Sequence, residues 1–334
     1  MNKRKLRFGV VGLGKMGLLH ASILNVLPDI ELVAFCEKST LMRKLFKKVF
    51  SNSDINVVDD VKRFQGLNLD AIYVTTPISS HFSIIKQIYR EHLASHVFTE
   101  KTLTLDYGQS RELSDVAKDS GGVNMVGYMK RFSMVFGKAR EILCNREIGE
   151  LQGFKAYAYS SDFIELTQES KSLESRGGAL CDIGCHVIDL ALWIFGRLEV
   201  NDVLSFVKNG TRVESSVSFK AVNSDGLSGL FNISQSLPGY RMPEFGLSIE
   251  GSNGRIDVSD DRLCLSLKDG NQRKWHRHDV NDGVYFSIGE PEYYRADSEF
   301  VKCILNYRGC ESSFENATVV DYIIDQVRNR SRMQ

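Results

Sequence analysis

The start of the chain constrains the fold more than any other segment. An apolar run at residues 6–11 leads directly into Gly12, Gly14 and Gly17, which follow the pattern G-x-G-x-x-G, and an amphipathic stretch then covers residues 18–27. Such glycines permit a tight turn, close approach of the backbone to a pyrophosphate and close packing of a helix on a strand. Free N–H groups at the start of the helix attract the phosphates. The segment therefore predicts a strand–turn–helix that binds a dinucleotide, through Gly12, Gly14, Lys15, Met16 and Gly17.

Glu37 indicates which dinucleotide is bound. A second apolar run, at residues 31–36, ends at this residue, twenty positions after Gly17. A carboxylate at this place accepts hydrogen bonds from the ribose hydroxyls of the adenosine and repels a 2′-phosphate, so NAD is the predicted cofactor. Lys38, Ser39 and Arg43 follow closely and could accommodate a 2′-phosphate, so NADP is the alternative.

Strand-like and helix-like segments alternate over residues 1–128. The expected strands are residues 6–11, 31–36, 56–58, 69–75, 95–99 and 123–127, and the expected helices are residues 18–27, 40–50, 80–92 and 106–118. This alternation predicts a doubly wound parallel sheet of the Rossmann type, whose ligands lie beyond the carboxyl ends of the strands. Two polar clusters fall at those ends. Their members are Thr75, Thr76, Pro77 and His81 in one cluster, and Glu100 and Lys101 in the other.

The pattern changes over residues 129–334. Period-two runs occur at residues 151–160, 213–222, 227–236, 245–249, 255–258 and 263–267, and helices are expected at residues 135–146, 293–306 and 316–328. Their spacing predicts an α+β domain with a large, mostly antiparallel sheet that carries helices on one face. We assign substrate binding and oligomerisation to this domain.

The segment 176–189 carries three ionisable side chains at helical spacing. Asp182, His186 and Asp189 lie at i, i+4 and i+7, and a helix from about residue 179 would place them on one face. A polar stripe on an otherwise apolar helix is costly to bury without partners. The simpler interpretation is a core helix whose polar groups bond to nearby backbone. Zinc binding by Cys181, Cys185 and His186 lacks a second cluster to complete the ligand set, so no metal is expected.

Composition excludes several functional classes. The chain has 334 residues, with 42 basic and 42 acidic side chains, and this balance gives no charged footprint for nucleic acid or for a membrane surface. No run of eighteen apolar residues suggests a membrane span. Seven cysteines, mostly within apolar runs, are typical of reduced thiols in a cytosolic protein.

Taken together, these motifs resemble the glucose–fructose oxidoreductase / inositol dehydrogenase / MocA (Gfo/Idh/MocA) family over nearly the whole chain. The matching motifs, in order, are the glycine fingerprint with His20 after it, Thr76-Pro77 with His81, Glu100-Lys101, and the pattern from Gly177 through Asp182 and His186 to Asp189. Residues 127–132 are also similar to the family's short motif at the domain junction.

The resemblance implies an NAD(P)-dependent oxidoreductase in which Lys101, Asp182 and His186 are catalytic and face the nicotinamide and the reacting carbinol. Histidine is a suitable base near neutral pH, and an ammonium group stabilises a developing alkoxide. Arg131 and Arg176 are added as substrate-binding residues. The expected reaction is hydride transfer between the nicotinamide and a secondary alcohol or ketone of a sugar, cyclitol or sugar derivative.

The chain departs from the family pattern at two positions. Thr102 replaces the proline that usually follows Glu-Lys, and because a cis bond before threonine costs about 3–4 kcal/mol, a trans bond is predicted. Arg176 stands where the family often has a small residue. Its guanidinium could reach an anionic group of the substrate, or it could form a surface salt bridge.

The family implies a homodimer or homotetramer. A reductase of a keto or imino substrate and a cofactor-binding regulator without turnover are the alternative functions. The substrate itself cannot be read from the sequence, because its specificity is assigned to the loops at residues 160–175 and 283–292.

Overall fold

The computed structural model describes residues 4–50, 54–164, 170–280 and 290–332. The chain forms two compact units. The first comprises Met1–Gly127 and Phe286–Thr318, and the second comprises Tyr128–Tyr285 and Val319–Gln334. A division into domains at residue 128 stays a prediction.

The first unit contains a parallel sheet with the strand order β3-β2-β1-β4-β5-β6. Its strands are β1 (Leu6–Val11), β2 (Ile30–Cys36), β3 (Asn56–Val58), β4 (Ala71–Val74), β5 (His96–Thr99) and β6 (Asn124–Val126). Strands that are buried on both faces have continuous apolar sequences, and every residue of β4 is buried. The predicted Rossmann sheet is confirmed.

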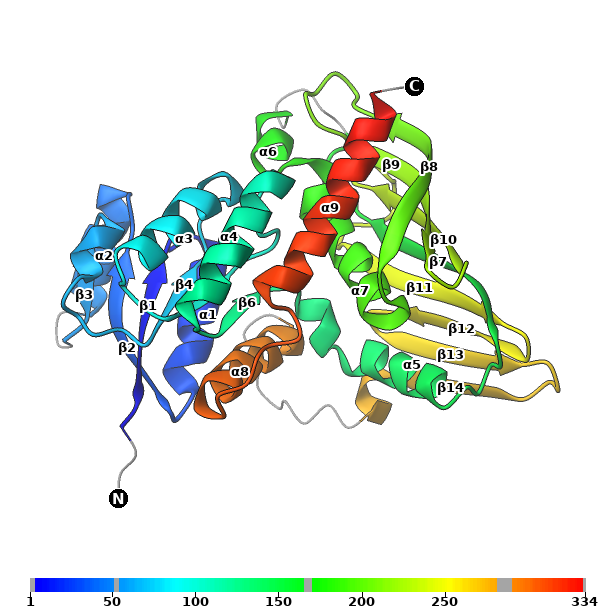
Figure 1. Ribbon diagram of the computed structural model, residues 1–334, viewed down its shortest axis with the longest axis horizontal. Coiled ribbons are helices and arrows are strands. Elements are labelled where there is room, and N and C mark those ends of the chain that lie inside the picture. The colour runs from blue at the N-terminus through cyan, green and yellow to red at the C-terminus, as the bar shows by residue number, and fades with distance from the viewer. Residues whose placement is uncertain (1–3, 51–53, 165–169, 281–289, 333–334) are drawn as a thin grey trace. The chain divides into compact units, whose positions relative to one another are not determined.

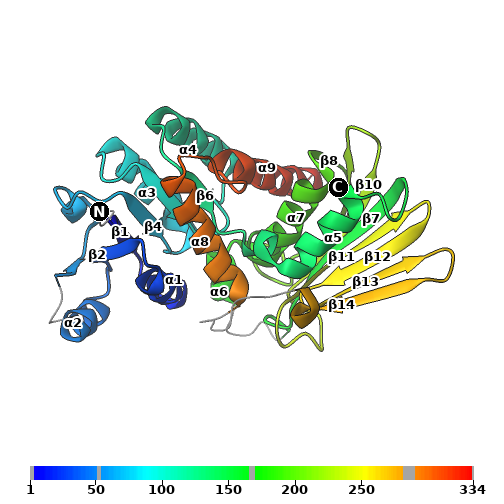
Figure 2. The same ribbon diagram turned by 90° about the horizontal axis from the view of Figure 1, so that it is seen from below.

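Helices cover both faces of this sheet (Figure 2). The helices α1 (Lys15–Val26), α2 (Thr40–Val49) and α8 (Pro291–Leu305) lie on one face, and α3 (His81–Arg90) and α4 (Tyr107–Ser120) lie on the other. Helix α8 packs against α1 although the two are far apart in the sequence. The segment after α8 bonds to β6, the edge strand of the sheet: the Val126 N–H donates to the Ser312 carbonyl oxygen at 2.8 Å.

The second unit contains an eight-stranded sheet with the order β14-β13-β12-β11-β7-β10-β9-β8. Its strands are β7 (Leu151–Tyr159), β8 (Leu198–Val207), β9 (Ser216–Asn223), β10 (Ser228–Ser234), β11 (Glu244–Gly251), β12 (Gly254–Ser259), β13 (Arg262–Leu267) and β14 (Gln272–His276). Only the β7–β10 pair among these described strands is parallel. The predicted large, mostly antiparallel sheet is confirmed.

Alternating side chains divide this sheet into a covered and an open face. In β11, Phe245, Leu247 and Ile249 are buried, while the intervening Ser248 is partly exposed. The helices α5 (Met134–Cys144) and α7 (Cys185–Phe195) pack against the buried side (Figures 1 and 2). No described helix of the second unit covers the opposite face, which Figure 2 shows nearly edge-on. The short α6 (Ser170–Ser175) and the C-terminal α9 (Phe314–Ser331) complete the helices that the structure describes.

Candidate active site

The glycine turn after β1 has the geometry that its motif predicts. Gly12 has φ +92°, and a Cβ atom there would lie 2.8 Å from the Thr76 methyl group. A Cβ atom at Gly17 would lie 1.9 Å from the Gly12 carbonyl oxygen, so only glycine lets α1 approach the turn this closely. Gly14 precedes α1 and has no atom within 4 Å of a Cβ position. The open space at Gly14, directly before the first turn of α1 with Lys15 and Met16, is what a pyrophosphate needs.

The Glu37 carboxylate lies at the end of β2, against the glycine turn. Its Oε2 accepts from the Leu13 N–H at 2.7 Å, and its Oε1 accepts from the Ser39 N–H at 2.7 Å. Each carboxylate oxygen still has a lone pair for a ribose hydroxyl. The two backbone bonds therefore orient the carboxylate without using up its acceptor capacity.

Arg43, a potential partner of a 2′-phosphate, is engaged by the backbone of the same loop. Its Nη1 donates to the carbonyl oxygens of Glu37 and Lys38 at 2.8 and 2.6 Å, and its Nη2 donates to Thr40 Oγ1 at 3.2 Å. A 2′-phosphate would have to compete with these acceptors for the guanidinium.

The cluster after β4 is tied to the strand ends by Thr75 and His81. Thr75 Oγ1 donates to the carbonyl oxygens of Val11 and Gly12. His81 is fully buried, and its ring nitrogens lie 3.0 Å from the Thr102 carbonyl oxygen and 2.8 Å from that of Thr76. Burial lowers the pKa of His81, against the opposing effect of these carbonyl groups. Both ring nitrogens of His81 thus contact backbone carbonyl groups, which holds the Thr76–Pro77 loop in place and leaves neither nitrogen directed at a ligand.

Glu100 and Lys101 follow β5 at the carboxyl edge of the sheet. Glu100 is buried, and its Oε1 lies 2.8 Å from Nε2 of His20 on α1. The His20 Nδ1 lies 2.9 Å from the Asp297 carboxylate on α8. Lys101 is half-buried, and its backbone N–H donates to Glu100 Oε2 at 3.4 Å. Lys101 therefore lies at the strand end, as predicted, directly after the buried ionic cluster of Glu100, His20 and Asp297.

The prediction of a trans bond between Lys101 and Thr102 is wrong, since the structure has this peptide bond in the cis form. Thr102 is fully buried, and its carbonyl oxygen faces the His81 ring. Its hydroxyl donates to the Thr104 carbonyl oxygen at 3.2 Å. The prediction weighed only the intrinsic preference of the bond, whereas these surroundings fix the conformation of the segment.

In the second unit, Asp182 lies in the π-helical turn Leu180–Gly184, which leads into α7. Its Oδ2 accepts from Gln235 Nε2 at 2.8 Å and from Arg176 Nη1 at 3.2 Å. Arg176 also approaches Asp162 at 3.7 Å, and its side chain is 47% exposed. Of the two roles considered for Arg176, the structure shows an ion pair, and this pair involves a predicted catalytic residue.

His186 and Asp189 follow on α7. His186 is buried, with the Phe245 ring at 5.1 Å and the Tyr128 ring at 6.5 Å, both edge-on. Arg131 binds Asp189 through two bonds, Nε to Oδ2 at 2.7 Å and Nη2 to Oδ1 at 2.6 Å. Burial raises the pKa of Asp189, although Arg131 opposes this effect. Arg131 thus braces the helix that carries His186, and substrate contact by Arg131 stays a prediction.

Glu214 and Arg328 support the start of this segment, and the sequence analysis did not identify either residue. Arg328 on α9 donates to Glu214 Oε1 at 3.0 Å and to the Gly177 carbonyl oxygen at 2.5 Å. Glu214 Oε1 also accepts from the Leu180 N–H at 3.1 Å. Gly178 has φ +81°, and a Cβ atom there would lie 2.6 Å from Glu214 Oε1. The glycine pair therefore lets a buried carboxylate hold the turn that carries Asp182.

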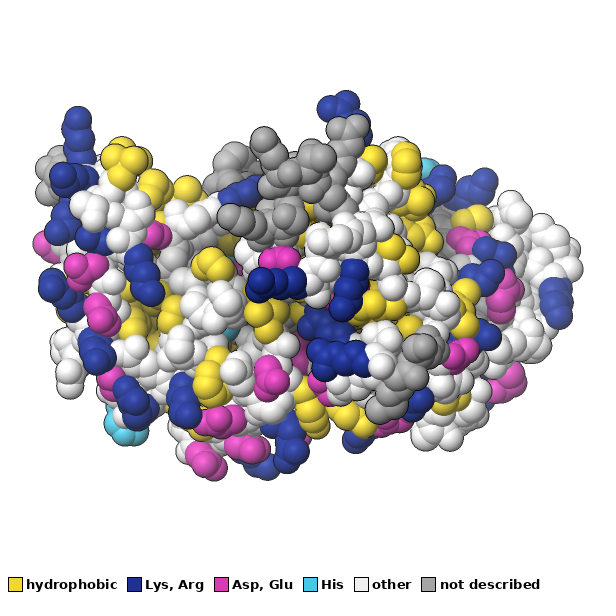
Figure 3. Space-filling view, turned by 90° about the horizontal axis from the view of Figure 1, so that it is seen from above, with side chains coloured by type: hydrophobic (Ala, Val, Ile, Leu, Met, Phe, Trp, Pro, Cys, Tyr) yellow, Lys and Arg dark blue, Asp and Glu magenta, His cyan; other side chains and the backbone are white. Residues whose placement is uncertain are grey.

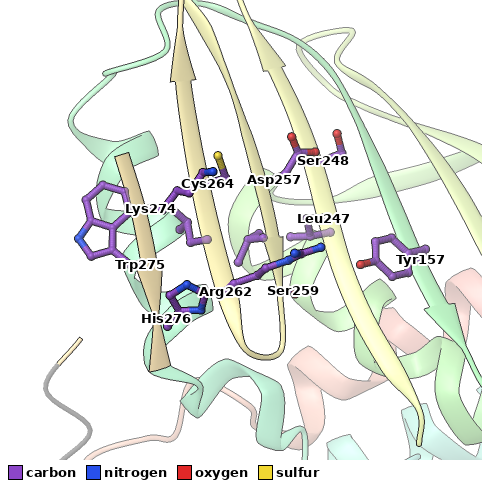
Figure 4. Close-up of a pocket in the computed structure, with 12 residues that line it drawn as sticks. Tyr157, Leu247, Ser248, Asp257, Ser259, Arg262, Cys264, Lys274, Trp275 and His276 are labelled. Atoms are coloured by element: carbon purple, nitrogen blue, oxygen red, sulfur yellow. The ribbon is translucent and has the colours of Figure 1, made fainter. Parts of the chain in front are cut away.

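A further hollow of about 550 Å³ lies against β7 and β11–β14 (Figure 4). Tyr157, Asp257, Arg262 and His276 are among its lining residues, and no residue predicted for the site lines it.

On the face drawn in Figure 3, basic and acidic side chains are interspersed. Within the described ranges, no cluster of three or more His, Cys, Asp or Glu side chains could hold a metal ion. Nor does any described helix have the length and apolarity needed to cross a bilayer.

Two family models and several characterised proteins are similar to this chain. A family model described as "Oxidoreductase family, NAD-binding Rossmann fold" matches residues 6–128, and one described as "GFO/IDH/MocA C-terminal domain" matches residues 136–257. The scyllo-inositol 2-dehydrogenase (NAD(+)) of Bacillus subtilis is 26% identical over 200 residues, which cover 58% of this chain and 55% of that protein. The myo-inositol 2-dehydrogenase of Thermotoga maritima is 24% identical over 284 residues, 80% of each chain.

Solved structures share the fold over nearly the full length. A levoglucosan dehydrogenase in complex with NADH and levoglucosan has a TM-score of 0.86 at 21% identity, with 99% of this chain and 98% of that chain covered. A 3-ketoreductase from Actinomadura kijaniata, in complex with TDP-benzene and NADP, has a TM-score of 0.81 at 20% identity, with 98% of each chain covered. At these identities the likeness concerns the fold.

Proposed function

This chain belongs to the Gfo/Idh/MocA family of NAD(P)-dependent oxidoreductases, and we propose that it transfers a hydride between the nicotinamide and a secondary alcohol or ketone of a sugar, cyclitol or sugar derivative. One observation carries the proposal: the family's reactive residue types are all present, as Lys101, Asp182 and His186. The Lys101 N–H donates to the Glu100 carboxylate, the Asp182 carboxylate accepts from Gln235, and the His186 ring packs against Phe245. Relatives named for inositol oxidation and a structural neighbour in complex with levoglucosan and NADH support the class of substrate.

The residues of the first unit fit a dinucleotide. The open space at Gly14 suits the pyrophosphate, and the Glu37 carboxylate has the acceptor capacity for ribose hydroxyls. The engagement of Arg43 by backbone carbonyl groups favours NAD over NADP. When bound, the nicotinamide supplies the hydride acceptor for oxidation or the hydride donor for reduction.

In this proposal, side chains of the protein accept the proton of the substrate hydroxyl and stabilise the charge that develops on its oxygen. We assign His186 the role of the base that accepts the carbinol proton, and Lys101 that of the donor that stabilises the developing alkoxide. Asp182 is oriented by Gln235 and Arg176, and its carboxylate can accept a hydrogen bond from a second hydroxyl of a polyol. Such an arrangement favours polyhydroxylated substrates. Parts of the loops assigned to specificity, residues 165–169 and 283–289, lie outside the described residues.

We also propose a cytosolic homodimer or homotetramer. The open face of the second unit's sheet supports self-association. No described helix of that unit covers this face, which carries serine, tyrosine and charged side chains around the hollow of Figure 4.

The test is nicotinamide absorbance at 340 nm with a panel of sugars and cyclitols, in both directions and with both cofactors. We expect turnover with at least one polyol and NAD. Tight NAD binding without turnover on any polyol or its keto form would instead favour a regulatory role for the fold. Turnover only with keto or imino substrates would favour the reductase.

A further inference from the structure

A buried ionic chain, Asp297–His20–Glu100, runs through the first unit to the residue before Lys101. His20 and Asp297 have no exposed side-chain surface, and Glu100 retains 10%. The His20 Nε2 lies 2.8 Å from Glu100 Oε1, and its Nδ1 lies 2.9 Å from both oxygens of Asp297. The three groups come from α1, α8 and the segment after β5, which the Rossmann sheet brings together.

The geometry of the ionic chain favours a protonated His20. A carboxylate can only accept hydrogen bonds, and a neutral imidazole donates from one nitrogen only. Both His20 nitrogens face carboxyl oxygens, so two ionised carboxylates are satisfied together only by an imidazolium. Burial raises the pKa of Asp297, and the charge and hydrogen bond of His20 oppose this effect. Burial lowers the pKa of His20, but the charges and hydrogen bonds of Asp297 and Glu100 outweigh it and raise that pKa to about 10. The rings of Phe98, Tyr73 and Tyr293, at 5.0, 5.6 and 5.9 Å, enclose the imidazolium.

Glu100 is held on several sides. Its N–H donates to the Val74 carbonyl oxygen at 3.0 Å, and its Oε2 accepts from the Lys101 N–H. A Cβ atom at Gly127 would lie 3.2 Å from Glu100 Oε1, so the absence of a side chain there leaves room for the carboxylate. Hydrogen bonding and charge from His20 offset the effect of burial and keep the pKa of Glu100 below its ordinary value. Glu100 is therefore a fixed anion next to Lys101.

We propose that His20 and Asp297 are positioning residues of the reaction, which hold Glu100 as an oriented anion and thereby set the placement of Lys101. This inference rests on the proposed function. Buried ion triads can often be replaced by apolar residues at no loss of stability, so the burial of these three groups is weak evidence for a purely stabilising role. Its location at the carboxyl edge of the sheet, one residue before the predicted catalytic lysine, links it to the site instead.

The test compares Asp297→Asn and His20→Gln with the control His96→Gln. His96 begins β5 at the opposite end from Glu100, and its Nδ1 accepts from the Val123 N–H at 2.8 Å. The control therefore removes a partly buried histidine from the same strand without touching the site. Circular dichroism identifies variants that do not fold, and Asp297→Asn is the milder variant because it keeps the His20–Glu100 pair.

For Asp297→Asn we expect kcat to fall about 10- to 100-fold, the range for small misplacements of a reacting group, with KM and the Kd for NAD within about 2-fold of wild type. The loss should deepen as pH rises from 6 to 9, because removal of the Asp297 charge lowers the pKa of His20, and a neutral ring holds Glu100 less firmly. The other groups facing the chain are Tyr73 from β4, Tyr293 from α8, and Lys101 and His81 beside Glu100. Variants that match His96→Gln in kcat at every pH would overturn the proposal.

A readout without turnover separates this proposal from the proposed function. In ¹⁵N NMR spectra of the whole protein, the wild-type His20 ring should stay doubly protonated from pH 6 to 9. In Asp297→Asn the ring should titrate, and the Lys101 backbone amide resonance should shift with the same midpoint. If no polyol is turned over but these shifts occur, the proposed function fails while the coupling of His20 to Lys101 stands. A Lys101 resonance that ignores the His20 titration overturns the coupling.

Discussion

Replacement of Arg131 with methionine should destabilise the second unit by about 3–5 kcal/mol, the cost typical of a buried ion pair that loses one partner. The Arg131 and Asp189 side chains are 7% and 1% exposed, and two short bonds join them. Methionine keeps much of the side-chain volume, so the loss should come mainly from the uncompensated charge. The matched control is Arg255→Met, whose pair with Asp257 is 49% and 48% exposed and should contribute less than about 1 kcal/mol.

The sign of the pH dependence follows from the pKa of Asp189. This pKa is raised by burial even with Arg131 present, and loss of Arg131 removes an effect that lowers it. A carboxyl group whose folded pKa exceeds its unfolded value contributes stability below the unfolded pKa and loses it as pH rises through the folded pKa. The deficit of Arg131→Met should therefore be small near pH 4 and grow toward pH 8.

Denaturant unfolding at several pH values measures this effect. Both tryptophans, Trp193 and Trp275, belong to the second unit, so their fluorescence follows that unit selectively. The double variant Arg131→Met/Asp189→Leu should recover most of the loss, because it removes the unpaired charge. A deficit near that of Arg255→Met, or one that shrinks with rising pH, would refute the reasoning. Unchanged stability with a raised KM would point instead to direct substrate binding by Arg131.

Three further predictions concern the proposed site and assembly. Glu37→Ala should weaken NAD binding about 10- to 100-fold, as expected for lost hydrogen bonds to a charged group, and relax discrimination against NADP; titration with both cofactors checks this. Lys101→Ala and His186→Ala should each lower kcat about 10²- to 10⁴-fold with little change in cofactor affinity in steady-state assays. Lys101→Arg should not restore activity, and His186→Ala should flatten the acid limb of the pH–rate profile. Light scattering at micromolar concentration should give a dimer or tetramer, and a monomer would contradict the proposed self-association.

Strand burial decided which parts of the fold were predictable. Residues 8–11 of β1 and all of β4 are buried, and their sequences carry no charged side chain, so the parallel sheet could be predicted. β8 and β14 are the two edges of the larger sheet and were not assigned as strands. Edge strands are half exposed, so their sequences mix charged and apolar residues without a clean period.

The residues proposed to react lie in local motifs, whereas the groups that orient them come from far along the chain. Asp182, His186 and Asp189 fall within one helical segment, and Glu100 and Lys101 are neighbours. Their partners are distant: Gln235 is 53 residues from Asp182, and His20 is 80 residues from Glu100. Spacing rules describe one helix or one turn and carry no information about such pairs.

One sequence signal for these supporting groups does exist. Asp297 lies in α8 on the same stripe as the buried Phe300, Val301 and Ile304, where a charge is costly unless it is paired. Such a residue predicts that a cationic or hydrogen-bonding partner exists without naming it, and the structure supplies His20. The same reasoning applies to Glu214 and Asp189, which are buried and bound by arginines. In this chain the motifs predict the reacting groups, while buried charges at apolar positions mark the contacts that orient the same segments.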